Sequence, residues 1–343
     1  MEDAGDTSPI LIVPYMWIGD FVRGHTVVRV LNQRWPNRPV DLLTTTLCAP
    51  LVDYMPGVRS GIRWDLPRGR LAVGRQRALA AELRSRGYGT ALVLPRTWKA
   101  AVAPALAGIP DRVGFFGEAR FGLINRMRWR EKALPRFIDK NAALALPEGV
   151  PLPPEWPVPQ LRVPNDEIGR WRQANGLGAG PAVALAPGSV GASKRWTYYP
   201  HAAKLLAEHG LDVWVIGGPG ETALAQEIVA VGGPCVRDLT GSDLRNGILA
   251  MAAASVAISN DSGLMHIAAA IGTPTIGIFG PTSPYLWAPL NGLAATVQTK
   301  TVVPCQPCHR TVCTMNDHRC MRDIAASDVV ETARRVLGEA ART

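Results

Sequence analysis

The feature of this sequence that most constrains its fold is a regular alternation of short, mostly apolar runs with longer segments of helical periodicity. In the first half, the runs Ile10–Val13, Val40–Leu43 and Ala91–Leu94 alternate with helical patterns at 22–34 and 72–86. Strands that are apolar at successive positions are typical of parallel sheets covered by helices on both faces. The alternation therefore predicts an α/β fold built of βαβ units.

Prolines interrupt this alternation midway along the chain. They are Pro147, Pro151, Pro153, Pro154, Pro157, Pro159 and Pro164. Proline continues neither a helix nor a strand ladder, and the alternation resumes with apolar runs at 182–186 and 213–216. Because 343 residues exceed what one core usually covers, we expect two doubly wound parallel-sheet domains, 1–160 and 161–343. Ligands should bind at the carboxyl ends of the two sheets, facing a cleft. The last helix is a candidate to pack back on the first domain.

The composition argues against a disordered or membrane-spanning chain. Hydrophobic residues make up 47% of the sequence and charged residues 19%, which is typical of globular proteins. No apolar run reaches the roughly 18 residues that span a bilayer, and the start, Met1-Glu2-Asp3, is acidic where a secretory signal is basic. We expect a cytoplasmic protein.

The net charge of +9 comes mostly from arginine, which prefers phosphates and carboxylates. Since the cations are scattered along the chain, a bias in amino-acid usage explains the charge equally well. The sequence has no zinc-finger spacing and no aromatic-basic run of the RNA-binding kind, so no nucleic-acid partner is expected. The stretch Gly217–Gly220 lacks the third glycine of a dinucleotide fingerprint, and no P-loop motif is present.

One loop of the second half is suited to bind phosphate. Residues 259–266 lead from a strand into an apolar helix, so the backbone N–H groups of 262–264 should point outward with the positive end of the helix dipole. His266 can add a donor to the same anion. In the alternative interpretation, Asp261 or Ser262 caps the helix and His266 is an ordinary helical residue.

Two further loops carry candidate polar groups. The loop 187–196 offers the Ser189 hydroxyl, glycine amides, and the cations Lys194 and Arg195. These groups suit a diphosphate, with Lys194 neutralising a leaving group, although a solvated turn is the alternative. In the first half, Asp20 follows the first strand, where its carboxylate either caps the next helix or acts as a general base.

In these stretches the sequence resembles the ADP-heptose:lipopolysaccharide heptosyltransferases, inverting enzymes of the GT-B fold, and most of all the heptosyltransferase II branch. The resemblance covers nearly the whole chain. The segments that carry it are Trp17–Asp20, Val93–Pro95 with Lys99, Ala107–Gly114, Lys194–Trp196, Asn260–His266 and Gly280–Pro284.

The resemblance implies transfer of L-glycero-D-manno-heptose from ADP-heptose to the inner-core heptose of lipopolysaccharide, with the acceptor bound in the first half and the donor in the second. By position it implies a catalytic base at Asp20, donor-phosphate contacts at Ser189, Lys194, Ser262, Gly263 and His266, a ribose contact at Glu221 and a heptose-hydroxyl contact at Asp261. Lys194 and the helix amides can stabilise the departing ADP, so no metal cofactor is required. A single displacement without an enzyme nucleophile inverts the anomeric centre.

The implied acceptor is Kdo-lipid A carrying heptose, whose anionic groups we expect Lys99 and Arg120 to face, together with Arg96 and Arg112. In the alternative interpretation, these four side chains are ordinary cations that face the solvent. An acceptor of this kind implies peripheral contact with the cytoplasmic face of the inner membrane. The rival functions are a heptosyltransferase of type I or III and a nucleotide-sugar-binding protein without catalysis, against which Asp20 argues.

A cysteine-rich segment stands apart from these motifs. It contains Cys305, Cys308, Cys313 and Cys320, interspersed with His309 and His318. Three interpretations are open: a structural zinc held by the four thiolates, a disulfide or redox-labile loop, and reduced packing cysteines. The isolated Cys48 and Cys235 are expected in the core.

Overall fold

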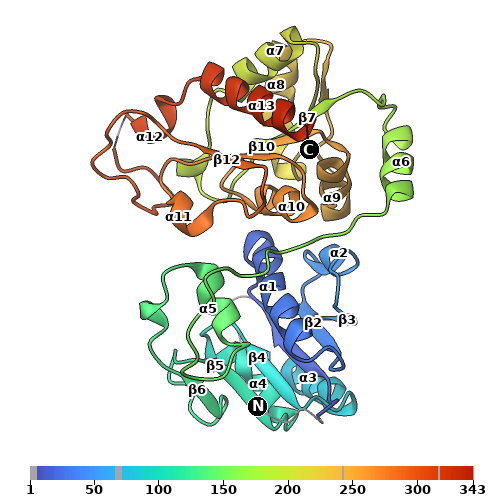
Figure 1. Ribbon diagram of the computed structural model, residues 1–343, viewed down its shortest axis with the longest axis vertical. Coiled ribbons are helices and arrows are strands. Elements are labelled where there is room, and N and C mark those ends of the chain that lie inside the picture. Colours follow the sequence, from blue (N-terminus) through green and yellow to red (C-terminus); the bar gives the residue numbers. More distant parts are fainter. Residues whose placement is uncertain (1–5, 66–71, 242, 316, 343) are drawn as a thin grey trace. The chain divides into compact units, whose positions relative to one another are not determined.

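The computed structural model describes residues 6–65, 72–241, 243–315 and 317–342, which Figure 1 traces from blue to red. The chain divides into two compact units, residues 1–160 and 161–343. Each unit contains its own sheet, and each is described separately below. None of the helices in the described ranges is long and apolar enough to span a bilayer.

The first unit holds a parallel sheet in the order β3-β2-β1-β4-β5-β6. Its strands are β1 (Ile10–Val13), β2 (Val40–Thr44), β3 (Ser60–Arg63), β4 (Thr90–Val93), β5 (Asp111–Phe115) and β6 (Arg126–Arg128). Its helices are α1 (Ile18–Arg34), α2 (Ala49–Val52), α3 (Val73–Ser85), α4 (Trp98–Leu106) and α5 (Phe137–Ala143), with a short 3-10 turn η1 (Glu131–Ala133).

The second unit repeats this arrangement, with a parallel sheet in the order β12-β11-β10-β7-β8-β9. Its strands are β7 (Ala182–Ala186), β8 (Asp212–Val215), β9 (Val236–Asp238), β10 (Val256–Asn260), β11 (Thr275–Ile278) and β12 (Ala294–Val297). The helices and 3-10 turns are α6 (Asn165–Ala174), η2 (Ala192–Lys194), α7 (Tyr199–Glu208), η3 (Pro219–Glu221), α8 (Thr222–Gly232), α9 (Leu244–Ala253), α10 (Gly263–Ile271), α11 (Pro284–Trp287), α12 (Arg319–Arg322) and α13 (Ala326–Ala340).

Both sheets have the same strand order, in which the first strand of the unit lies beside the fourth. These neighbours are β1 and β4 in one unit and β7 and β10 in the other. At such a position the chain direction across the sheet reverses, and the loops leaving the two strands diverge to leave a crevice at their carboxyl ends. The topology therefore identifies four loops as candidates for ligand binding, namely those that begin after β1, β4, β7 and β10.

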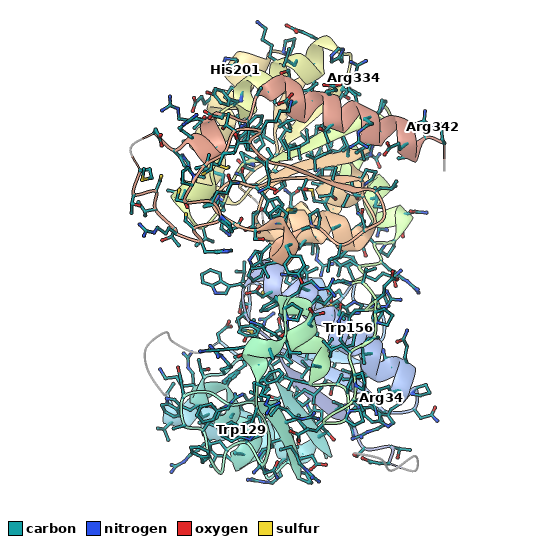
Figure 2. The ribbon with its side chains drawn as sticks, turned by 60° about the vertical axis from the view of Figure 1, so that its left-hand side comes forward. Arg34, Trp129, Trp156, His201, Arg334 and Arg342 are labelled. Atoms are coloured by element: carbon teal, nitrogen blue, oxygen red, sulfur yellow. The ribbon has the colours of Figure 1, made fainter. Side chains whose placement is uncertain are left out.

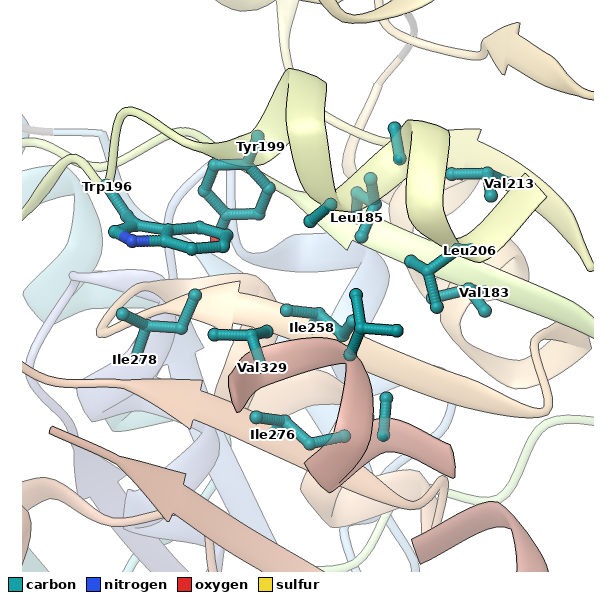
Figure 3. Close-up of a cluster of buried hydrophobic side chains, with 14 of the residues drawn as sticks. Val183, Leu185, Trp196, Tyr199, Leu206, Val213, Ile258, Ile276, Ile278 and Val329 are labelled. Carbon is teal, nitrogen blue, oxygen red and sulfur yellow. The ribbon is translucent and has the colours of Figure 1, made fainter. Parts of the chain in front are cut away.

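The central strands are apolar because helices cover both faces of each sheet. Strands β1, β4, β7 and β10 are buried at every position. In the second unit, Figure 3 shows Val329 of α13 beside Ile258 and Ile278 of the sheet, with Trp196 and Tyr199 side by side at one end of the cluster. Helix α13 packs on α7 and β12 of this unit.

The proline-rich segment is fixed to the first unit by side-chain hydrogen bonds. The indole Nε1 of Trp156, labelled in Figure 2, donates to Asp139 Oδ1 at 2.8 Å. The Gln160 backbone N–H donates to His25 Nδ1 at 3.0 Å, and His25 Nε2 lies 2.8 Å from the Pro56 carbonyl oxygen. Buried polar groups thus anchor a segment that forms neither helix nor strand.

Two local expectations differ from the structure. The first helix begins at Ile18 and not at Val22, because its opening turn contains Gly19 and Asp20, which interrupt the apolar pattern without breaking the helix. Cys48 is buried as expected, but Cys235 is exposed. Cys235 lies just before β9, an edge strand of the sheet, and this position explains its exposure.

Candidate functional site

In the second unit, an ion pair joins the two loops at the crevice between β7 and β10. The ammonium group of Lys194, in the loop after β7, lies 2.8 Å from Asp261 Oδ2, directly after β10. The Lys194 side chain is 28% exposed and that of Asp261 7%. The structure therefore brings together two residues that lie far apart in the sequence and that were expected in one site.

Buried Asn260 fixes the relative position of these loops. Its side-chain Nδ2 donates to the Pro187 carbonyl oxygen at 2.6 Å, while its Oδ1 accepts from the Trp196 backbone N–H at 3.2 Å. Both partners belong to the loop after β7. Asn260 stood within a recognised motif, but its part in joining the loops depends on strand pairing that only the structure reveals.

The loop after β10 leads into α10 through an N-terminus without a side-chain cap. Ser262 occupies the N-cap position, yet its hydroxyl lies 3.0 Å from Ser259 Oγ and does not bond to the first helical turn. Ser262 is therefore the N-cap by position, as the alternative interpretation had it, but its side chain does not cap the helix. The first turn, which begins at Gly263, presents backbone N–H groups with the positive end of the helix dipole. His266 lies one turn along and is 5% exposed.

Glu221 and Ser189 lie around the same crevice. The Glu221 carboxylate accepts from the Gly218 N–H at 2.8 Å, and its side chain passes so close to Gly188 that a Cβ there would meet it at 2.8 Å. A glycine at 188 is thus needed for Glu221 to approach the loop after β7. The Ser189 hydroxyl donates to the Gly191 carbonyl oxygen at 2.8 Å and is mostly buried.

The cysteine-rich segment contacts this loop directly. Every backbone polar group of Ser193 bonds to it: the N–H donates to Thr311 O at 3.1 Å, and the carbonyl oxygen lies 2.7 Å from His318 Nε2. The Ser193 hydroxyl donates to the Arg310 carbonyl oxygen. Because Ser193 immediately precedes Lys194, Arg310, Thr311 and His318 form a brace that holds the lysine in place.

The four clustered cysteines are all in the thiol form, with Cys320 buried and Cys305 exposed. Burial, with a smaller contribution from the other three cysteines, raises the pKa of Cys320 to about 11. Within the described ranges, no three His, Cys, Asp or Glu side chains are arranged to hold a metal ion. The zinc interpretation stays a prediction, for which metal analysis is the test.

In the first unit, Asp20 lies at the carboxyl edge of the sheet, in the first turn of α1. The N-cap of that helix is Trp17, without a side-chain cap, so the expectation that Asp20 is the capping residue is wrong. Burial raises the pKa of the neighbouring Tyr15 to about 12, and the carboxylates of Glu131 and Asp20 contribute to the increase. Asp20 thus belongs to a charged group around Tyr15.

The loop after β4 forms a second part of this edge. Thr97, Trp98, Lys99 and Glu118 line a pocket of about 520 Å³. The Trp98 backbone N–H donates to Glu118 Oε2 at 3.1 Å. The pocket therefore combines an ammonium group, an indole and a carboxylate, groups that can bind a polar, charged acceptor.

Two of the arginines expected to face an acceptor do not do so. Arg120 is 1% exposed, and its guanidinium donates to the carbonyl oxygens of Pro95 and Phe115. Burial lowers the pKa of Arg120 to about 10. Arg112 donates to the carbonyl oxygens of Ile109, Leu123 and Gly122. Both guanidinium groups satisfy main-chain acceptors in loops, a use that the sequence does not distinguish from ligand binding. Arg96 is exposed and pairs with Glu131 at 2.8 Å.

Comparison with known proteins assigns the family. The model of glycosyltransferase family 9 (heptosyltransferase) matches residues 76–318. The chain belongs to this family. Among similar proteins, lipopolysaccharide heptosyltransferase 2 of Escherichia coli is 34% identical over 309 residues, or 85% of this chain and 88% of that protein. The Salmonella typhimurium lipopolysaccharide heptosyltransferase 2 is 32% identical over 347 residues, covering 96% and 99%.

Solved structures agree with this assignment of the family 9 glycosyltransferase. The structure of Escherichia coli ADP-heptose lipopolysaccharide heptosyltransferase II has a TM-score of 0.86 at 30% identity and covers 97% of this chain and 99% of that one. The heptosyltransferase WaaC with ADP, at 19% identity, has a TM-score of 0.73. The two Rossmann-like units of this glycosyltransferase are therefore those of the GT-B fold.

Proposed function

We propose that this glycosyltransferase transfers L-glycero-D-manno-heptose from ADP-heptose to the inner-core heptose of lipopolysaccharide, the heptosyltransferase II reaction. The names of the relatives support this substrate pair. The observation that carries the proposal is the Lys194–Asp261 pair at the N-terminus of α10, where a cation and helix amides adjoin a carboxylate. Such a site can bind a sugar diphosphate at both its anionic and its hydroxyl-bearing parts.

The donor would occupy the crevice of the second unit. The diphosphate accepts hydrogen bonds from the amides at Gly263 and from Lys194, with the Ser189 and Ser262 hydroxyls and His266 completing the cradle. Glu221 binds the ribose hydroxyls, because its carboxylate reaches the loop after β7. Asp261 accepts hydrogen bonds from heptose hydroxyls. Binding moves Lys194 from a carboxylate partner to a phosphate partner, so its charge is always balanced.

The reaction is a single in-line displacement. The acceptor hydroxyl oxygen bonds to the anomeric carbon while the bond from that carbon to the β-phosphate oxygen of ADP breaks, which inverts the centre. Asp20 takes the hydroxyl proton as the new bond forms, and the departing electron pair stays on ADP. Lys194 and the α10 amides stabilise the charge on ADP, so the transfer requires no metal; each such donor is typically worth about 3 kcal/mol.

The acceptor, Kdo-lipid A carrying heptose, would bind the first unit. Lys99, in its pocket with Glu118, and the exposed Arg96 are the cations available to its carboxylates and phosphates. Arg120 is left out of this role because its guanidinium is buried. A lipid-linked acceptor places the enzyme at the cytoplasmic face of the inner membrane.

The test is a transfer assay with ADP-heptose and truncated core acceptors that end in Kdo, in one heptose or in two heptoses. Mass and linkage analysis of the product should show one heptose added to the acceptor that already carries one, with inversion at the anomeric centre. Transfer to the Kdo-terminated acceptor would instead indicate the type I reaction, and transfer to the acceptor with two heptoses the type III reaction. Tight ADP-heptose binding without any product would indicate a binding protein.

A further inference from the structure

Three large aromatic side chains are exposed together on the first unit. Phe116, Phe121 and Trp129 are 41%, 63% and 56% exposed. The rings of Phe116 and Trp129 stack with centroids 4.8 Å apart, and those of Phe116 and Phe121 lie 5.8 Å apart. Isolated exposed apolar residues are common, but three rings in contact form a patch that marks an interaction surface.

The backbone holds these rings at the end of the sheet. Strands β5 and β6 pair in parallel, and the Phe116 N–H donates to the Arg128 carbonyl oxygen at 2.8 Å, which extends the pairing up to the rings. Three non-glycine residues of these loops have left-handed backbones: Glu118, Ala119 and Arg130, with φ values of 44°, 49° and 62°. Non-glycine residues rarely adopt this conformation, and it persists where the surroundings fix it, often at functional surfaces.

Cations are close to these rings in the sequence. Residues 116–136, which contain all three aromatic residues, carry Arg120, Arg126, Arg128, Arg130, Lys132 and Arg136 against the two acids Glu118 and Glu131. Of these cations, Arg126, Arg130 and Lys132 are exposed, and Arg126 pairs with Asp111 at 2.8 Å. We define the aromatic–basic face as Phe116, Phe121 and Trp129 with these three exposed cations.

We propose that the aromatic–basic face docks the protein on an anionic lipid surface. Tryptophan and other aromatic rings partition into the headgroup region of a bilayer, and arginine and lysine beside them attract anionic lipids over a Debye length. Charge complementarity therefore selects this partner. A carbohydrate is a weaker fit, because the three rings lie outside the pocket formed by Thr97, Trp98, Lys99 and Glu118. The inference deepens the proposed function by naming the surface that contacts the membrane. It rests on that function only for the identity of the membrane, because binding to a lipid surface can be measured without the transfer reaction.

The experiment is flotation of the purified full chain with vesicles that contain no lipopolysaccharide. Phosphatidylcholine vesicles are compared with vesicles of phosphatidylcholine and phosphatidylglycerol, at low and at high salt. The protein should float with the anionic vesicles only, and high salt should weaken its binding. Phe121→Ala/Trp129→Ala and Arg130→Glu/Lys132→Glu should each lower the partition coefficient about tenfold or more.

Matched control variants distinguish a specific role of the aromatic–basic face from the general effects of changing net charge or removing an exposed apolar side chain. Arg170→Glu/Arg335→Glu changes the net charge by the same amount at exposed positions on α6 and α13, and should leave vesicle binding unchanged. Val231→Ala is the control for an exposed apolar side chain on α8. All variants should retain transfer to a soluble, delipidated acceptor, which is measured separately so that failure of the proposed function does not affect the vesicle result.

Three results would overturn the proposal. The first is equal binding of the wild-type protein to neutral and anionic vesicles, or no binding to either. The second is unchanged vesicle binding by both double variants of the face. The third is a raised KM for the soluble acceptor in the face variants while vesicle binding stays intact, which would assign the rings to the glycan.

Discussion

At the residue scale, the chemistry of the second unit depends on a lysine and an aspartate that neutralise each other. Lys194 lies within 2.8 Å of Asp261, and both are partly or largely buried. Removing one partner of such a pair leaves the other charge poorly solvated. The same two residues are proposed to bind different parts of the donor, so substitutions here should affect binding, catalysis and stability together.

We expect Lys194→Ala to lower kcat about 10²- to 10³-fold, because the departing ADP loses its cationic partner. Steady-state transfer assays measure the effect, and calorimetry with ADP should show weaker binding. Lys300→Ala is the matched control, since Lys300 is exposed and pairs with Asp328 on α13. Equal activity of Lys194→Ala and the wild type would remove the lysine from the mechanism.

Asp20→Asn should lower kcat about 10²- to 10⁴-fold, because the amide cannot accept the acceptor proton. ADP binding should stay unchanged, since all proposed contacts with the donor belong to the second unit. Asp166→Asn, on the exposed surface of α6, serves as the control. Turnover by Asp20→Asn at the wild-type rate would show that another group, or water, takes the proton.

His25 should make the first unit less stable in acid. Burial lowers the pKa of His25 to about 4, from 6.5, so the unfolded chain binds a proton that the folded chain does not. The resulting loss in the free energy of unfolding is absent above pH 6.5 and grows as the pH falls. It is complete near pH 4, where it reaches about 3 kcal/mol. Urea unfolding at several pH values, compared with His25→Gln, should show a shallower decline for the variant. Parallel curves would contradict this assignment.

At the element scale, the apolar runs predicted most of the sheets. The strands at 10–13, 40–44 and 182–186 lie within a residue of their expected positions because each is buried on both faces, which leaves a continuous, mostly apolar run. The loop after β10 was predicted as a strand-to-helix turn for the same reason. The apolar patterns are local, and they contain no information on which loops meet.

Apart from Lys194 and Asp261, which the resemblance assigned to the same donor, contacts between loops were therefore the part that the sequence did not predict. Arginine is a residue type that often binds anionic ligands, but the guanidinium groups of Arg120 and Arg112 donate to backbone carbonyl oxygens instead. The brace formed by Arg310, Thr311 and His318 was missed because each of its bonds to Ser193 has a backbone atom on at least one side, and every residue possesses such atoms. Only the three-dimensional path of the chain distinguishes these cases.

The brace leads to a prediction for His318. We expect His318→Ala to lower kcat/KM for the donor about tenfold, mainly by raising KM, because the Ser193 carbonyl loses its partner and Lys194 is held less firmly. His318→Gln should restore part of the loss, since its amide can donate the same hydrogen bond. His201→Ala on α7 is the control. A fall in thermal stability with unchanged donor KM would give His318 a purely structural role.

At the scale of the whole molecule, transfer should proceed without a divalent cation. Prolonged treatment with EDTA is expected to leave the rate unchanged, because fixed protein groups supply the positive charge beside the departing ADP. Loss of activity that Mg²⁺ restores would contradict this. Elemental analysis of the same samples tests the thiol cluster, since about one zinc per chain would indicate that the thiols rearrange around a metal.

The border between the units consists of two consecutive residues that are anchored separately. The N–H of Gln160 bonds to His25 in the first unit, and the N–H of Leu161 bonds to the Ala270 carbonyl oxygen in the second. A chimera joined at this peptide bond would inherit complete anchors from both parents. Exchanging either half between relatives should then exchange one substrate preference at a time, which makes this bond the natural crossover point for recombining acceptor and donor specificities.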